Sequence, residues 1–128
     1  WPDRATVRAS YGSRPPLDAL APEALAAYVR WGFVDRDDGQ VELACAPETE
    51  AGIFDSGSRH GPLQTFHRLG DVSAPTSVLA GTLTDLAADW FVEQAEILGT
   101  EVVWVEGGHF FLFEDIDRAE GLVRSHLG

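Results

Sequence analysis

A histidine that follows a short apolar run is the residue of this chain whose setting best suits chemistry. The run Val102–Val105 has the character of a buried strand, and Gly107 and Gly108 stand between it and His109. Open α/β sheets place functional groups on loops at the carboxyl ends of their strands. An imidazole there can take up and release a proton near neutral pH. His109 is therefore a candidate for catalysis, against the alternative of a loop histidine that only hydrogen-bonds beside aromatic neighbours.

The segments around His109 predict a parallel β-α-β unit. Residues 78–81 form a short β-rich run stopped by glycine, and residues 101–105 form a second apolar run. Between them, residues 85–98 carry apolar side chains at helical spacing, and Gly99 can close that helix. One helix between two apolar strands implies parallel pairing with a right-handed crossover.

The chain divides into two regions on these patterns. Residues 73–128 hold the strand–helix–strand–helix series, and Asp115 or Asp117 starts its last helix. Residues 1–72 look helical and irregular. Within them the patterns predict a helix over 21–30, a turn over 35–40, a strand over 41–45, a short helix from 47 to 54, a loop over 55–62 and a helical run over 63–69.

Both regions resemble parts of one known family. The runs 78–81 and 102–105, with Gly108–Phe110 and Glu114, resemble the last two strands and the histidine loop of α/β-hydrolases. Residues 1–72 resemble the helical cap that some members insert before those strands, through Arg14–Pro16, Ala27–Val29, Gly32–Phe33, Leu43 and Pro47–Ala51. The resemblance covers almost the whole chain. It implies an α/β fold class: the C-terminal portion of an α/β-hydrolase, with a parallel βαβ unit, a C-terminal helix and a mainly helical cap.

The resemblance also implies roles for two residues. His109 corresponds to the general base, which takes the proton of a nucleophile and later delivers it to the leaving group. Asp85 is the nearest candidate for the acid that orients such a histidine, but threonine occupies the usual Gly-x-x-Asp position after Gly81 and Asp85 comes one residue late. Three readings stay open: Asp85 reaches His109 from a longer loop, the acid lies upstream of Trp1, or Asp85 is only a helix N-terminal carboxylate.

The sequence contains no Gly-x-Ser-x-Gly nucleophile elbow. The chain has no methionine and begins with Trp1, which favours a fragment, a processed product or a trimmed form. We therefore expect the C-terminal fragment of a serine-type hydrolase of ester or amide bonds that is inactive alone, although an aspartate nucleophile fits the same fold. Its expected partner is the missing N-terminal half or a second chain that covers the sheet edge. The alternative is a small non-enzymatic α/β module that binds or assembles through that edge.

Composition limits the partners, the location and the substrate that the chain is expected to have. The net charge of −12 disfavours nucleic acid and membrane surfaces as partners, and no motif indicates a metal or cofactor. The single cysteine, Cys45, shares a face with Val41 and Leu43, which predicts a buried structural thiol and fits a cytoplasmic location. The expected substrate is small and apolar to moderately polar. Four aromatic residues are assigned either to the core or to a substrate pocket under the cap: Trp31, Phe33, Phe54 and Phe66.

Overall fold

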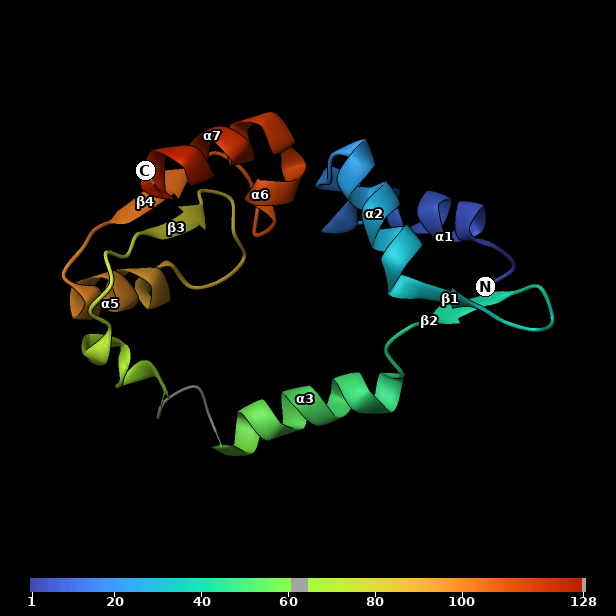
Figure 1. Cartoon of the computed structure of the whole chain (residues 1–128), viewed down its shortest axis with the longest axis horizontal. Helices are drawn as coiled ribbons and strands as arrows, with labels where there is room; N and C mark the ends of the chain where they lie inside the picture. Colours follow the sequence, from blue (N-terminus) through green and yellow to red (C-terminus); the bar gives the residue numbers. More distant parts are fainter. Residues whose placement is uncertain (61–64, 128) are drawn as a thin grey trace.

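The computed structural model describes residues 1–60 and 65–127 as an α/β chain with two groups of elements (Figure 1). The first group contains α1 (Arg4–Tyr11), the 3-10 turn η1 (Leu17–Ala19), α2 (Pro22–Gly32), β1 (Phe33–Asp35), β2 (Val41–Leu43) and α3 (Pro47–His60). The second contains η2 (Leu69–Asp71), β3 (Val78–Gly81), α5 (Ala88–Leu98), β4 (Val102–Val105), α6 (Phe111–Glu114) and α7 (Ile116–Leu127). A domain border at residue 72 stays a prediction.

The first group is built on an antiparallel hairpin. Strands β1 and β2 pair with Phe33 opposite Leu43 and Asp35 opposite Val41, and Gly39 takes a positive φ of 79° in the turn between them. Helices α1 and α2 pack against each other, and α2 leads directly into β1 (Figure 1). Their apolar side chains and those of the hairpin meet in one cluster of buried residues, which consists of Val7, Leu25, Val29, Phe33 and Val41.

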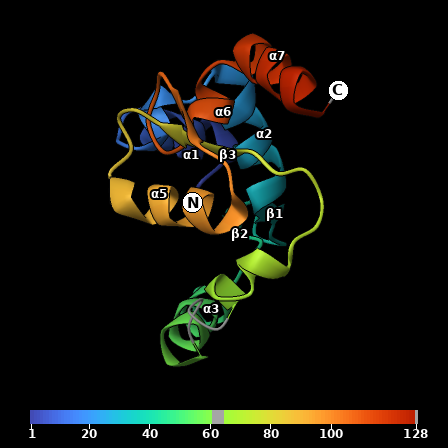
Figure 2. The same cartoon turned by 90° about the vertical axis from the view of Figure 1, so that its left-hand side faces the viewer.

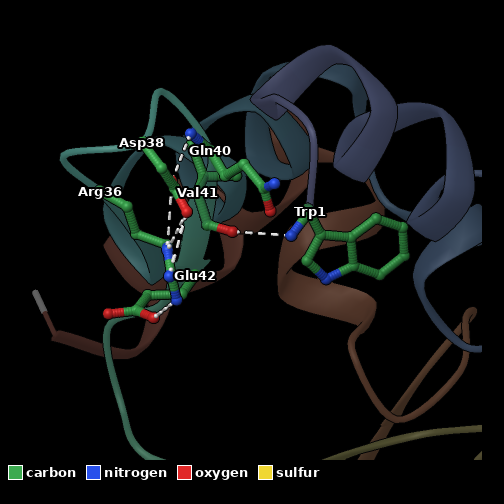
Figure 3. A network of polar contacts seen from close by, with 6 residues as sticks. All are labelled: Trp1, Arg36, Asp38, Gln40, Val41 and Glu42. Carbon is green, nitrogen blue, oxygen red and sulfur yellow. Dashed lines mark hydrogen bonds and ion pairs between the residues drawn. The ribbon is translucent and has the colours of Figure 1, made fainter.

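Polar contacts fix the hairpin and the start of the chain to each other (Figure 3). The amino group of Trp1 donates to the carbonyl oxygen of Val41 at 2.8 Å, and the amide of Val41 donates back to Trp1 at 2.9 Å. Arg36 bonds to Asp38 and, at 2.8 Å, to Glu42 across the hairpin. The hydrogen bonds from Arg36 and from the Gln40 amide lower the pKa of the Asp38 carboxyl.

The second group is the predicted parallel unit. Strands β3 and β4 pair in parallel, with Val78 opposite Val102 and Gly81 opposite Val105, and α5 connects them. Gly99 closes α5 in the left-handed conformation at φ 68°. Figure 2 shows α5 running beneath the strands, with α6 and α7 on their other side. The pairing confirms the β-α-β prediction.

The boundaries of two segments differ from the prediction. Helix α5 begins at Ala88, three residues after Asp85. The preceding residue, Ala87, is extended (φ −61°, ψ 122°), and no side chain caps the start of the helix. Helix α3 continues through residues predicted as a loop, since its helical hydrogen bonding outweighs the local turn formers and runs to His60. The predicted run over 63–69 lies partly outside the described residues, and its last residue begins η2.

Two further differences concern the first group. Cys45 is exposed rather than buried, because β2 ends at Leu43 and the Ala44 amide bonds to Gly32, which turns the chain toward α3. Helix α1 had no sequence prediction. It begins where the Asp3 side chain accepts a hydrogen bond from the Thr6 amide at 2.7 Å.

Candidate active site

His109 lies on the loop that connects β4 to α6. Strand β4 ends at Val105, and the chain turns through residues 106–110 before α6 begins at Phe111. The imidazole is exposed, and its ring centroid lies 5.2 Å from that of Phe110. Among the described residues, no hydrogen bond or ion pair joins His109 to another side chain. The structure thus presents an accessible imidazole at the carboxyl end of a parallel strand, as the sequence predicted.

The histidine loop is tied to the end of the neighbouring strand. The amide of Thr82 donates to Val105 and the amide of Leu83 donates to Gly107, each at 2.8 Å. The two segments approach so closely that a Cβ atom on Gly81 would lie 2.0 Å from the carbonyl oxygen of Gly108. Glycine is therefore the only residue that fits at the end of β3 with the loop in this position.

Glu114 braces the same loop from the side of α6. Its two carboxylate oxygens accept a hydrogen bond from the Gly108 amide at 2.9 and 3.1 Å. Gly107 has a positive φ of 137°, and a Cβ atom there would lie 2.7 Å from a Glu114 oxygen. The carboxylate thus holds the backbone immediately before His109. The family resemblance included Glu114, but its contact with Gly108 becomes visible only in the structure.

Asp85, the candidate acid, lies on the segment that follows β3. It is exposed in the turn between β3 and α5, and among the described residues no hydrogen bond or ion pair joins its side chain to that of His109. Nor does Asp85 cap α5, whose N-cap is Ala87, so that alternative is wrong. Thr84, at the usual position of the acid, is half-buried and accepts a bond from the Leu86 amide at 3.3 Å. Among the described residues, no acidic side chain is therefore paired with His109.

An apolar cleft lies between the first group and the histidine loop. It has a volume of about 480 Å³, and its walls come from η1 and α2 on one side and from the loop, α6 and the start of α7 on the other. The amide of Ala21 donates to the carbonyl of Phe113 at 2.8 Å, which joins the two walls. The lining residues are Leu17, Leu20, Glu23, Ala24, Ala27, Tyr28, Phe110, Phe113 and Ile116.

The aromatic residues singled out in the sequence do not form this cleft. Phe33 is only 2% exposed and belongs to the buried cluster of the first group. Trp31 is 73% exposed and lies against the guanidinium of Arg30 at 4.8 Å. Sequence patterns missed Phe110 and Phe113 because their role depends on contact between α2 and the histidine loop. The adjacency of Phe110 to His109 was the one available signal.

In residues 1–60 and 65–127, no group of three or more His, Cys, Asp or Glu side chains is arranged to hold a metal ion. None of the helices in that part of the chain has the length and hydropathy needed to cross a bilayer.

No protein-family model and no curated protein sequence matches the chain. Several solved structures do, two of them as follows. The crystal structure of E-2-(acetamidomethylene)succinate hydrolase matches 99% of the chain with a TM-score of 0.80 and 18% identity. A thioesterase domain from the curacin biosynthetic pathway matches 100% of it with a TM-score of 0.69 and 20% identity. The chain spans only 46% and 43% of these two proteins. It therefore has the fold of the C-terminal portion of an α/β-hydrolase.

Proposed function

We propose that this chain supplies the histidine part of a hydrolase active site. The observation that carries the proposal is the exposed imidazole of His109 on a loop that β3, through Gly81, and Glu114 both hold in place. Catalysis requires such a fixed position, because a base acts only within hydrogen-bond reach of the proton that it removes. In this role His109 takes the proton of the nucleophile and then delivers it to the leaving group.

The nucleophile comes from residues outside this sequence, since no Gly-x-Ser-x-Gly elbow is present in it. A serine would hydrolyse an ester- or amide-type bond through an acyl-enzyme, and an aspartate would serve the related chemistries of the same fold. The partner that carries it is an N-terminal half or a second chain. Among the described residues, β3 and β4 pair only with each other, which leaves an edge where further strands can pair. The chain alone is then inactive.

Two positions remain for the acid. Asp85 follows β3 and serves His109 if the turn between β3 and α5 brings the two side chains together in the assembled site. Alternatively, the acid comes from an earlier strand of the partner segment, since Thr84 stands at the usual position in this chain. The variant Asp85→Asn separates the two, because loss of a true triad acid lowers kcat by on the order of 10⁴, whereas loss of an exposed turn residue leaves it unchanged.

The substrate is proposed as small and apolar to moderately polar. The apolar cleft beside the histidine loop supports this proposal, and the net charge of −12 opposes nucleic acids and anionic membranes as partners. A cytoplasmic location stays a prediction. Similarity to the succinate hydrolase and to the thioesterase domain supports hydrolysis as the reaction class only, because both are about 20% identical or less to the chain.

Non-enzymatic assembly through the sheet is the second candidate function. It is favoured by two exposed tryptophans, Trp90 on α5 at 57% and Trp104 on β4 at 43%. An assembly module would bind its partner equally well with or without His109. The two functions are separable for that reason.

The test measures kcat and KM of the complete protein and its His109→Ala variant with a short-chain ester. We expect kcat to fall by on the order of 10⁴–10⁶ while KM changes little. His67→Ala is the matched control, because His67 is also exposed and also stands beside a phenylalanine ring, that of Phe66. Equal activity in wild type and His109→Ala contradicts the proposed role and leaves assembly as the better account.

A further inference from the structure

We propose that the outer edge of β2 is a strand-addition site, and that in the complete protein it holds the segment immediately before Trp1, which continues antiparallel to β2 past Leu43. This inference rests on the proposed function only for the existence of an N-terminal half. The hydrogen bonds that define the edge involve neither His109 nor its loop. The edge is therefore testable even if the catalytic role of His109 is wrong.

The backbone of β2 directs alternate residues toward and away from β1. Antiparallel strands alternate between pairs that exchange hydrogen bonds and pairs whose amide and carbonyl groups point away from the partner strand. The amide of Ala44 donates to the carbonyl of Gly32 at 2.9 Å, so this pair is of the bonded kind. Leu43, one residue earlier, and Val41, three residues earlier, are therefore of the other kind. Their N–H and C=O groups point to the outer edge of the hairpin.

Trp1 already pairs with one of these two residues (Figure 3). Its amino group donates to the carbonyl of Val41 at 2.8 Å, and its carbonyl accepts from the Val41 amide at 2.9 Å. Two residues that exchange both bonds are paired antiparallel. Leu43 presents the same two groups on this edge, and no residue in the described part of the chain bonds to them. The edge thus offers one unpaired N–H and one unpaired C=O beside an existing strand residue.

A groove lies along the same edge. It has a volume of about 410 Å³, and its lining includes Trp1, Leu43 and, at the start of α3, Pro47. The charged side chains in the lining are Arg36 and Glu42, which form an ion pair with each other at 2.8 Å. The unpaired polar groups at the groove are therefore those of the backbone. Such an edge is suited to an extended peptide segment, whose main chain supplies the matching hydrogen bonds.

The pairing of Trp1 determines which segment reaches Leu43. In antiparallel pairing, one residue back along one strand matches one residue forward along the other. The residue before Trp1 therefore lies opposite Glu42, and the second residue before it lies opposite Leu43. A segment joined to Trp1 is held at this edge at high effective concentration. It makes β2 the central strand of a three-stranded sheet, which is more stable than an isolated two-stranded hairpin.

Amide hydrogen exchange tests the proposal at a single position. The comparison is between the 128-residue chain and the complete protein, in which the N-terminal half precedes Trp1. In the chain alone, the Leu43 amide should exchange freely while Val41 is protected. In the complete protein, we expect the Leu43 amide to exchange at least about tenfold more slowly. Asp37, exposed in the hairpin turn, is the control and should not change. Equal exchange of Leu43 in the two proteins overturns the proposal.

Designed extensions of the 128-residue chain test the pairing itself. Adding Ser-Val-Thr before Trp1 places the valine opposite Leu43 and should slow exchange of the Leu43 amide by at least about tenfold. The matched extension Ser-Pro-Thr should lose most of this effect, because proline has no N–H to donate to the Leu43 carbonyl. The proposal fails if Ser-Val-Thr leaves Leu43 unprotected or if both extensions protect it equally. His109→Ala in the complete protein should retain the protection, which separates this result from the test of catalysis.

Discussion

The two groups of elements differ in how they are stabilised. The hairpin group encloses a cluster of large apolar side chains that are almost fully buried, with Val7 at 0% and Phe33 at 2% exposure. Among the described residues, the sheet group buries fewer hydrophobic side chains, namely Ala80, Ala95, Val105 and Phe111, while Trp104 on β4 stays 43% exposed. Parallel sheets normally have both faces covered by other elements. We therefore expect the group that carries His109 to be the one that depends on further structure.

The large buried cluster and the candidate catalytic histidine therefore lie in different groups of elements of the same chain. The hairpin group encloses its own cluster of buried residues and offers one wall of the apolar cleft through α2. The sheet group supplies the histidine loop. Backbone hydrogen bonds and close glycine contacts hold this loop, although the group buries few apolar side chains. Preorganisation of His109 rests on a few close contacts rather than on a large buried area. Mutations in the two groups should accordingly have different consequences.

The largest effect is expected at the centre of the hairpin group. Phe33→Ala removes a ring that is 2% exposed and lies 5.9 Å from the ring of Tyr11, so it should lower the free energy of unfolding by about 3–5 kcal/mol. Trp90→Ala, at a residue 57% exposed, should cost less than about 1 kcal/mol. Denaturant unfolding followed by NMR amide intensities reports each group separately. Equal losses in the two variants would remove the contrast between the groups.

Gly81→Ala should have the next largest effect, and on the histidine loop in particular. The added Cβ atom would lie 2.0 Å from the carbonyl oxygen of Gly108, so the histidine loop must move. We expect the free energy of unfolding to fall by about 1–3 kcal/mol and the kcat of the complete protein to fall as well. Gly121→Ala is the matched control, since a Cβ atom there would point into open space. In helix α7 that change should raise stability by about 0.5–1 kcal/mol. A Gly81→Ala protein with wild-type kcat would show that the loop position is irrelevant to activity.

Glu114→Ala should have a smaller effect on stability. It leaves the part-buried Gly108 amide without its acceptor, which costs about 1.5 kcal/mol, and loosens the backbone before His109. We expect kcat to fall while KM is kept, because the residue positions the base and does not line the cleft. Glu114→Gln retains one carbonyl oxygen and should recover part of both losses. If the two variants behave alike in kcat and in thermal unfolding, the carboxylate does not hold the loop.

The smallest effect is a pH dependence at the wall of the cleft. Burial, with contributions from Tyr11 and Glu50, raises the pKa of the Tyr28 phenol above its ordinary value. The neutral phenol is thus favoured in the folded state. Its contribution is present below about pH 10 and is lost as the pH rises through the raised pKa. At a side chain 43% exposed, we expect less than about 0.5 kcal/mol. Tyr28→Phe should flatten the alkaline fall in melting temperature, and an unchanged fall would assign it to other groups.

Much of the sheet group could be predicted from the sequence because its signals are local. The apolar runs, the helical spacing and Gly99 define β3, α5 and β4, and their order fixes the parallel pairing. The last helix likewise begins after Asp115, whose side chain accepts a bond from the Arg118 amide at 2.9 Å. Local patterns do not define element boundaries, since the start of α5 depends on the extended backbone of Ala87.

The site was predictable only in part, for a physical reason. His109 stood out because strand, glycines and imidazole are adjacent in the sequence. The contacts of Gly81 with the loop and the cleft lined by Phe110 and Phe113 join segments that are far apart in the chain. Periodicity carries no information about such contacts. The exposure of Cys45 was missed for the same reason, because it follows from where β2 ends.

Amide hydrogen exchange of the full chain tests most directly the claim that the histidine-bearing group depends on further strands and the hairpin group does not. We expect the amides of Val29 and Val41, in the buried cluster and the hairpin, to exchange at least about tenfold more slowly than those of β3 and β4. Slower exchange in β3 and β4 than at Val29 and Val41, or equal exchange in both groups, would show that the sheet is stable by itself and would contradict the account.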